Sequence, residues 1–146
     1  SAPIRTETDG AAWKQAIYYP FLHASRYGRG TALRSVISST KHDSKNHEDV
    51  TDVEAVAVYN EEKEEVTIFA VNRSVKEDAQ FEADVRCFEG YEVKECLVLE
   101  NDDMKVVNSA AGEKVSPRSK TDYTLDDGVF RTQMKKCSWN VIRFGK

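Results

Sequence analysis

Acidic residues that occur in pairs are the first candidates for chemistry, because two carboxylates can bind calcium or share acid–base work. Three such pairs stand out in this chain, Glu61-Glu62, Asp102-Asp103 and Asp126-Asp127. Each pair falls in a predicted turn, and neighbouring residues of an extended chain point to opposite sides. The spacing of a calcium-binding EF-hand loop is absent from the sequence. We therefore predict that these are solvent-exposed turn residues.

Three histidines and several serines are the next candidates, for metal binding and for nucleophilic catalysis. His23, His42 and His47 lie too far apart to form an HxxxH or HExxH motif, which would put two ligands on one helix face. Ser25 and the pair Ser38-Ser39 have no surrounding GxSxG motif, which exposes the nucleophile of many hydrolases on a sharp turn. The sequence therefore predicts no metal site and no cofactor, and we assign no catalytic residue.

The cysteines bear on the cellular compartment rather than on catalysis. Cys87, Cys96 and Cys137 make an odd number and form no CxxC motif. Such a pattern favours buried or half-buried free thiols in a reducing compartment. No signal peptide is recognisable, and we expect a cytoplasmic protein.

One aromatic segment could bind a sugar. Trp13, Gln15, Tyr18 and Tyr19 combine flat apolar surfaces with side chains that donate and accept hydrogen bonds. Aromatic rings stack on the faces of sugar rings, and amides hydrogen-bond to sugar hydroxyls. The same residue types also pack in ordinary cores, with the polar ends of Tyr and Trp satisfied at the surface. Residue types alone favour the packing interpretation over sugar binding.

The elements that would position this segment can be predicted from its pattern. Residues Trp13–Tyr27 carry apolar side chains at helical spacing and predict a helix that starts near Ala11. Asp9-Gly10 is a possible N-terminal cap, and the polar residues before it predict a loop or disorder over Ser1–Asp9. Pro20 should kink the helix or start a second one, because proline lacks a backbone N–H. Gly28-Arg29-Gly30 is a plausible stop.

This helix also suggests that the chain belongs to something larger. It is apolar on nearly every side, and such helices are usually buried in the core of a large protein. The strands that follow predict one compact β unit, not two layers able to surround the helix. We therefore expect the chain to be the C-terminal piece of a bigger protein, with the helix contacting a part that precedes it.

From Asp52 onward the sequence predicts short antiparallel strands separated by turns, which is typical of a sandwich or jelly roll. The first two predicted strands should form a hairpin, and residues 101–120 should be a long connection with one short strand near Val106. The predicted strands are Val53–Tyr59, Val66–Asn72, Gln80–Arg86, Tyr91–Glu100, Tyr123–Leu125, Val129–Met134 and Trp139–Phe144.

Composition and charge limit the possible partners and divide the chain. The 146 residues carry a net charge of −4, and no basic stripe suggests a nucleic-acid partner. No apolar run approaches the ~20 residues of a membrane-spanning helix, so we expect no membrane partner. Acidic residues are absent between Ala11 and His42 and frequent afterwards. This change predicts two units, residues 1–34 and 53–146, joined by a polar linker at 35–52.

Four separated stretches occur in this order, AWKQAIYYPFLHASRYGRGTAL, EAVAVYNEEKEEVTIFAVNR, VLENDD and SWNVIRFGK. Together they resemble the C-terminal end of family 51 α-L-arabinofuranosidases, and the resemblance extends from about Ala11 to Lys146. It implies a mainly β fold, an antiparallel β-sandwich of jelly-roll type, preceded by one α-helix left over from a (β/α)8 catalytic barrel. Lys14, Ala16 and Phe144 replace the more usual Arg, Thr and Leu, which leaves fine specificity open.

The resemblance also implies a function. Enzymes of this family remove terminal arabinofuranosyl groups from arabinan, arabinoxylan and arabino-oligosaccharides with retention of configuration. Their two catalytic glutamates lie upstream of the matched segment, so this chain alone is expected to be inactive. Gln15 matches a glutamine that contacts the bound arabinose. The expected partners are the catalytic barrel of the same protein, its arabinose-containing substrates and further copies in a homo-oligomer.

A carbohydrate-binding β-sandwich module is the alternative function, because jelly rolls also serve that purpose and fold alone does not decide. Binding modules usually display exposed aromatic side chains on one face. The strand aromatics Phe69, Phe81, Tyr91 and Trp139 lie in apolar runs, and we expect them to point inward. The sequence therefore favours a sandwich that braces the catalytic barrel and contributes to subunit contacts.

Overall fold

The computed structural model describes residues 2–35, 37–43 and 45–146. Most of the elements formed by these residues are strands, and the one helix is α1 (Tyr18–Tyr27). The strands are β1 (Ile4–Thr6), β2 (Ala12–Lys14), β3 (Thr31–Leu33), β4 (Lys41–His42), β5 (Val50–Thr51), β6 (Val53–Asn60), β7 (Glu65–Asn72), β8 (Ala79–Asp84), β9 (Glu92–Leu99), β10 (Arg118–Ser119), β11 (Tyr123–Asp126), β12 (Val129–Met134) and β13 (Ser138–Gly145).

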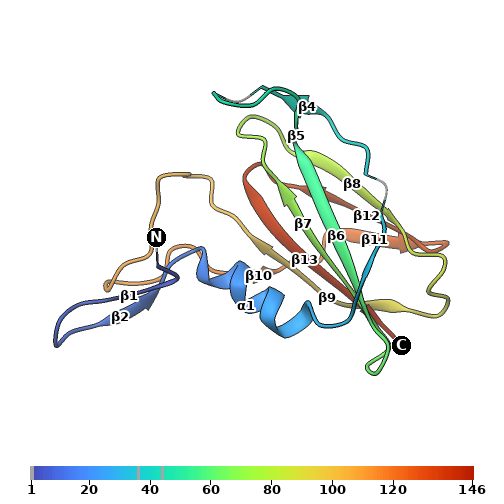
Figure 1. Ribbon diagram of the computed structural model, residues 1–146, viewed down its shortest axis with the longest axis horizontal. Coiled ribbons are helices and arrows are strands. Elements are labelled where there is room, and N and C mark those ends of the chain that lie inside the picture. Colours follow the sequence, from blue (N-terminus) through green and yellow to red (C-terminus); the bar gives the residue numbers. More distant parts are fainter. Residues whose placement is uncertain (1, 36, 44) are drawn as a thin grey trace.

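The main layer is a six-stranded antiparallel sheet with the strand order β10-β9-β13-β7-β6-β3 (Figure 1). The predicted hairpin between β6 and β7 is confirmed, with Val53 opposite Asn72 and Asn60 opposite Glu65. The last strand, β13, lies between β7 and β9 and pairs with both over most of its length. The end of the chain therefore forms the centre of this sheet, where both neighbours satisfy its backbone groups.

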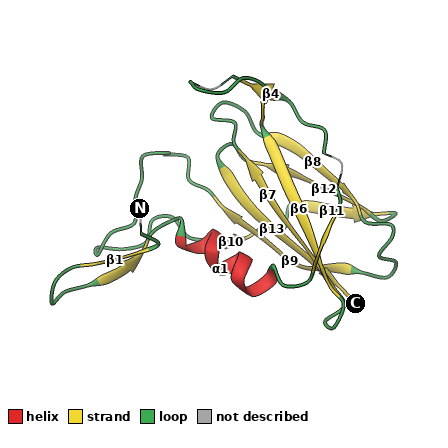
Figure 2. Ribbon diagram, viewed as in Figure 1, coloured by secondary structure: helices red, strands yellow, loops and turns green. Residues whose placement is uncertain are grey.

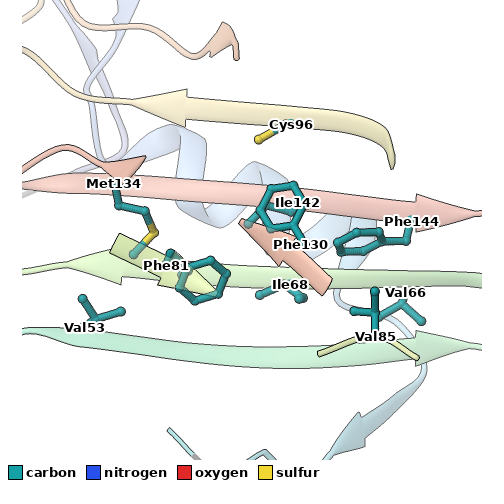
Figure 3. Packing of buried hydrophobic residues seen from close by; sticks show 11 residues of the cluster. Val53, Val66, Ile68, Phe81, Val85, Cys96, Phe130, Met134, Ile142 and Phe144 are labelled. Carbon is teal, nitrogen blue, oxygen red and sulfur yellow. The ribbon is translucent and has the colours of Figure 1, made fainter. Parts of the chain in front are cut away.

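The second layer is a three-stranded antiparallel sheet, β11-β12-β8, and the main core lies between the two layers (Figure 3). Phe130 from β12 and Phe144 from β13 meet there edge to face, with ring centroids 5.5 Å apart. Both side chains are completely buried. Alternation along each strand explains the core, because inward residues such as Val66 and Ile68 are two positions apart. The predicted antiparallel β-sandwich preceded by one helix is confirmed.

Helix α1 packs on the opposite face of the main sheet (Figure 2). Tyr19, His23 and Tyr27 are four residues apart and share one helix face. Phe69 and Trp139 lie beneath this face of the helix. The prediction that the strand aromatics point inward is confirmed for Phe69, which is buried, and Trp139 is half-buried. Both face α1 and not the smaller sheet, because the main sheet has a second apolar face that α1 covers.

The predicted helix start near Ala11 is wrong. Residues 12–14 form β2, which pairs with β1, and α1 begins only at Tyr18. The expected loop over Ser1–Asp9 contains β1, although Ser1 itself lies outside the described residues. Asp9-Gly10 forms the hairpin turn instead of a helix cap, with a positive φ of 52° at Asp9. Hairpin pairing satisfies the backbone of residues 12–14 in place of helical hydrogen bonds, and apolar spacing alone does not distinguish the two.

The two predicted helix-breaking residues, Pro20 and Gly28, lie near the two ends of α1. Pro20 lies in the first turn of α1, where a backbone N–H has no helical partner to lose, and it follows the helix start without dividing the helix. The predicted stop is confirmed, because the Gly28 N–H donates to the Ala24 carbonyl at 2.9 Å and the helix ends at Tyr27.

The long connections differ in detail from the prediction. No strand forms near Val106 among the described residues, and the connection contains turns, a single bridge between Ser109 and Gly112, and β10. The polar residues 35–52 include the two-residue pair β4–β5, while Val36 and Ser44 lie outside the described residues. Before this stretch, β3 pairs with β6 and so joins the main sheet. The division into units at 34 and 53 stays a prediction.

The contact between the layers should dominate the stability of the chain. We expect Phe130→Ala to lower the free energy of unfolding by about 3–5 kcal/mol, because it leaves a cavity beside Phe144. Phe21→Ala is a matched control, since this phenylalanine is 61% exposed on α1, and it should change the stability of the chain by no more than about 0.5 kcal/mol. Urea unfolding of both variants measures the difference, and similar losses would contradict the assignment of the core.

Candidate functional site

Gln15 lies in the short connection between β2 and α1, with its backbone held on both sides. Its N–H donates to the Pro3 carbonyl at 2.8 Å, and its carbonyl accepts from the Tyr18 N–H at 2.9 Å. The side chain is half-buried and makes no hydrogen bond to the described residues. An amide in this state can donate to and accept from a ligand without first breaking an internal bond.

The aromatic residues around Gln15 have different surroundings. Trp13 lies in β2 opposite Arg5, whose guanidinium is 5.9 Å from the centre of the indole ring. Its Nε1 is buried and has no hydrogen-bond partner among the described residues. Tyr18 lies under the Lys14 ammonium at 5.4 Å and contacts Tyr19 edge to face. The sequence-predicted aromatic cluster is therefore divided between the hairpin and the helix.

The loop between β9 and β10 is distant in sequence but contacts the connection between β2 and α1 (Figure 1). The buried side chain of Asn108 donates to the Lys14 carbonyl at 3.0 Å and to the Val115 carbonyl at 2.8 Å. Its oxygen accepts from the N–H groups of Lys114 and Val115, both at 2.8 Å. One amide thus orders its own loop and connects it to the residue that precedes Gln15.

A second connection joins the same loop to α1. The Tyr19 hydroxyl donates to the carboxylate of Glu113, and its ring packs with Leu99 and Val115. Burial raises the pKa of Tyr19 to about 12, and the hydrogen bond and negative charge of Glu113 act in the same direction. Tyr19 is therefore a neutral donor at physiological pH, and its ring contributes to the packing of the helix on the sheet.

His23 is the buried polar residue in the middle of α1. It is 4% exposed, and its Nδ1 lies 3.1 Å from Nε1 of Trp139, which can only donate. The ring is therefore the tautomer with its proton on Nε2. Burial lowers the pKa of His23, the negative charge of Glu95 opposes this shift, and Arg26 adds to it. Neutral His23 thus links the helix to the sheet beneath it.

The C-terminal end of α1 contacts the side chain of Arg143. The guanidinium of Arg143, on β13, lies 4.2 Å from the centre of the Tyr27 ring. It also pairs with Glu95 at 2.9 Å and with Glu65 at 3.1 Å. Burial alone would lower the pKa of Arg143, but the two carboxylates raise it. The arginine therefore stays charged and stacks on the tyrosine from the sheet side.

The other candidates from the sequence lie elsewhere and have structural partners. His42 is 2.6 Å from Asp52, which also accepts from the Thr40 hydroxyl, and these hydrogen bonds lower the pKa of the Asp52 carboxyl, Thr40 contributing most. The paired acids are exposed, and Glu61-Glu62, Asp102-Asp103 and Asp127 lie in turns or loops as predicted. Asp126 is instead the last residue of β11, so the turn prediction is wrong for it. Within the described part of the chain, no three His, Cys, Asp or Glu side chains group closely enough to hold a metal ion.

The three cysteines are free thiols in different environments. Cys96 is buried, and burial raises its pKa to about 11, so it is unreactive at neutral pH. Cys87 is exposed, and Cys137 is half-buried with its sulfur 3.2 Å from that of Met104. Neither chemistry nor position connects these thiols with Gln15.

A cavity of about 730 Å³ lies between the two layers, on the side of β6 and β8. Its walls include Ala55, Ala57 and Ile68 of the main sheet and Phe81 and Val85 of the smaller layer. Gln15 and the aromatic residues near it are not among the lining residues. Polar residues such as Asp52, Asn72 and Asp78 line the cavity together with these apolar core residues.

Two antiparallel layers with a helix docked on the outer face define a β-sandwich domain with an attached α-helical segment. The chain belongs to the family of α-L-arabinofuranosidase C-terminal domains, whose profile matches residues 1–138. α1 has ten residues, and none of the helices in the described residues is long and apolar enough to cross a membrane.

Relatives and solved structures agree with this assignment. The chain is 55% identical over 146 residues to an intracellular exo-α-(1→5)-L-arabinofuranosidase of Acetivibrio thermocellus and 43% identical over 145 residues to one of Bacillus subtilis. Each match covers 99% of this chain but 29% of the relative. A family 51 α-L-arabinofuranosidase structure from Bifidobacterium longum matches with a TM-score of 0.90 and 28% identity, over 98% of this chain and 28% of that one. The predicted resemblance is confirmed.

Sequence reasoning missed the residues that hold Gln15. Asn108 and Glu113 lie in an irregular loop 94 positions from Lys14 and Tyr19, the residues that they bind. No local pattern marks such a contact, because it depends on the path of the loop after β9. The contact between His23 and Trp139 was missed for the same reason, since 116 positions separate the two residues.

The lowered pKa of His23 predicts a loss of stability in mild acid. The unfolded state takes up a proton below pH ~6.5 while the folded state does not, so stability is complete above this pH and falls below it. The loss should reach up to ~1.4 kcal/mol per pH unit. Urea unfolding between pH 7.5 and 5.5 measures this dependence.

The His23→Gln variant isolates this contribution. Its amide oxygen can still accept from Trp139 but does not titrate in this range, so its stability should depend less steeply on pH than that of the wild type. His47→Gln, in an exposed part of the chain, controls for the removal of one histidine. If the free energy of unfolding changed equally steeply with pH in the wild type and in His23→Gln, His23 would not stay neutral in the folded state.

Proposed function

We propose that this chain is the C-terminal part of a retaining α-L-arabinofuranosidase. A (β/α)8 barrel elsewhere in the same protein carries the two catalytic carboxylates, which retention requires to be about 5–5.5 Å apart. In this proposal residues 1–34 complete the barrel, residues 35–52 are the linker, and residues 53–146 form a non-catalytic sandwich that braces it. The chain spans 29% of the length of its A. thermocellus relative, which leaves room for a barrel of about 250 residues.

The observation that carries the proposal is an apolar stripe on the outer side of α1. Ile17 and Phe21 are 44% and 61% exposed, and Ala24 continues the same stripe. Ile17 and Phe21 lie on the side of the helix opposite Tyr19, because two positions along a helix correspond to about 200° of rotation. One face of the helix is thus buried on the sandwich while the opposite face is apolar and uncovered, as expected for a helix packed between two bodies.

Gln15 is the proposed contact with the arabinose. Its amide lies just before the first turn of α1, and the surrounding backbone is fixed while the side chain stays available. An uncharged amide can hydrogen-bond to sugar hydroxyls without altering the pKa values of nearby catalytic carboxylates, as a charged side chain would. In a barrel enzyme this position belongs to a loop at the C-terminal face, where such sites are built.

The proposed substrates follow from the relatives. Several are named exo-α-(1→5)-L-arabinofuranosidases, which supports terminal arabinofuranosyl groups as the substrate of the whole protein. From the family resemblance we propose that these groups belong to arabinan, arabinoxylan and their oligosaccharides. The same relatives are called intracellular, and we propose a cytoplasmic location. Assembly into a homo-oligomer completes the proposal, with the sandwich contributing to the contacts between subunits.

The isolated chain and the full-length protein should differ in activity. On a chromogenic α-L-arabinofuranoside, we expect turnover by the full-length protein and none by residues 1–146, because both catalytic carboxylates lie outside this chain. Robust turnover by the chain alone would overturn the proposal. Saturable binding of arabinan by the inactive chain would instead favour a carbohydrate-binding module.

The stripe on α1 predicts that one substitution behaves differently in the two contexts. Phe21→Ala should be nearly neutral in the isolated chain, but in the full-length protein it should cost about 3–5 kcal/mol, because the ring is then buried. Met104→Ala, 60% exposed in a loop outside α1, is the control and should have a small effect in both. Urea unfolding midpoints give the comparison, and a neutral Phe21→Ala in the full-length protein would show that nothing covers the stripe.

A further inference from the structure

We infer that Asn108 and Glu113, in the loop between β9 and β10, are positioning residues for Gln15. The sandwich would then contribute to substrate recognition, because its loop is hydrogen-bonded to the start of α1. It would also brace the proposed catalytic barrel. This inference rests on the proposed contact between Gln15 and arabinose.

The first argument is the saturated hydrogen bonding of Asn108. The side chain is 2% exposed, and both amide hydrogens and both acceptor positions of its oxygen are in use. Three of these four bonds fold the loop onto itself at Lys114 and Val115. The fourth reaches the Lys14 carbonyl. A loop that is already ordered therefore offers one fixed donor to the segment before Gln15.

The second argument is the peptide group to which this donor is bound. The Lys14 carbonyl and the Gln15 N–H belong to one planar unit. Asn108 binds the carbonyl from one side, and the Pro3 carbonyl accepts the N–H from the other. The plane is thereby fixed, and with it the direction in which the Gln15 side chain leaves the backbone. This side chain has no hydrogen-bond partner in the described residues, so the direction of its Cα–Cβ bond, which the backbone sets, is the part of its orientation that the loop contacts control.

The third argument is a second contact of the same loop, with Tyr19 in the first turn of α1. Glu113 accepts from the Tyr19 hydroxyl, so the same loop holds the chain on both sides of Gln15. Misplacing a substrate-binding group by about 1 Å can cost on the order of 100-fold in rate. Losing the loop contacts should therefore weaken the reaction even though Asn108 and Glu113 do not touch the sugar themselves.

The test is a double-mutant cycle in the full-length protein, measured as kcat/KM on a chromogenic α-L-arabinofuranoside. Gln15→Ala should lower kcat/KM by about 10- to 100-fold, the range expected for a lost hydrogen bond to substrate. Asn108→Ala should lower it by about 10-fold. In the Gln15→Ala background, Asn108→Ala should change it by less than about two-fold, because its effect acts through the missing amide.

Two milder variants keep the test decisive if Asn108→Ala does not fold. Asn108→Asp preserves side-chain volume and the oxygen that accepts from Lys114 and Val115, but a carboxylate cannot donate to the Lys14 and Val115 carbonyls. Tyr19→Phe keeps the packed ring and removes only the hydroxyl that binds Glu113. Each should lower kcat/KM in the wild-type background and have little effect when Gln15 is already alanine.

Asn72→Ala is the matched control. Asn72 is fully buried and bonds to the backbone of Glu77, Met134 and Ser74, none of which belongs to β1, β2 or α1. It should lower the unfolding midpoint as Asn108→Ala does, yet leave kcat/KM of the folded protein unchanged. A fall in kcat/KM for Asn72→Ala as large as that for Asn108→Ala would reduce the effect to general destabilisation and overturn the inference.

The remaining outcomes separate the two proposals. If Gln15→Ala leaves kcat/KM unchanged, the sugar contact assigned to Gln15 is wrong, and the positioning role is lost with it. If Gln15→Ala lowers kcat/KM but the loop variants have the same effect in both backgrounds, the sugar contact stands and the positioning role is overturned. Coupling of the loop variants to Gln15 supports both.

Discussion

The main sheet is apolar on both faces, and this constraint organises the rest of the structure. On β13, Ile142 and Phe144 point to the smaller sheet while Trp139 and Val141 point the other way. A strand with two apolar faces is stable only when both are covered, because each exposed Å² of apolar surface costs about 25 cal/mol. The β11-β12-β8 sheet covers one face, and α1 covers part of the other.

Covering the second face ties the helix to the sheet by specific contacts as well as by burial. Trp139 donates a hydrogen bond to neutral His23. The charged guanidinium of Arg143 stacks on Tyr27 and forms ion pairs with Glu65 and Glu95. A buried polar group is costly unless it is paired, so each of these contacts also fixes the position of the helix along the sheet. The helix consequently has one defined orientation, with the stripe of Ile17 and Phe21 outward.

A helix held in this way gives its N-terminal end a fixed place, and the β9–β10 loop closes over that end. Two hydrogen bonds join the loop to this end, from Asn108 to the Lys14 carbonyl and from the Tyr19 hydroxyl to Glu113, and Val115 of the loop packs against the Tyr19 ring. The chain thus combines three functions that could have been separate: filling a sheet face, presenting an apolar surface for a neighbouring body, and holding an amide where a ligand can reach it. The second and third belong to the proposed function.

The sequence by itself determined the seven longer strands from Val53 onward, the β6–β7 hairpin, the sandwich class, the end of the helix at Gly28 and the family, because these follow from local patterns and from long matched stretches. It did not determine that residues 12–14 form a strand, because the apolar spacing of Trp13 and Ile17 fits a helix equally well and the pairing with β1 decides. Nor did it place Phe69 and Trp139 under α1, or join Asn108 to Lys14 across 94 positions. Such contacts depend on which distant segments the fold brings together, and only the tertiary structure supplies that information.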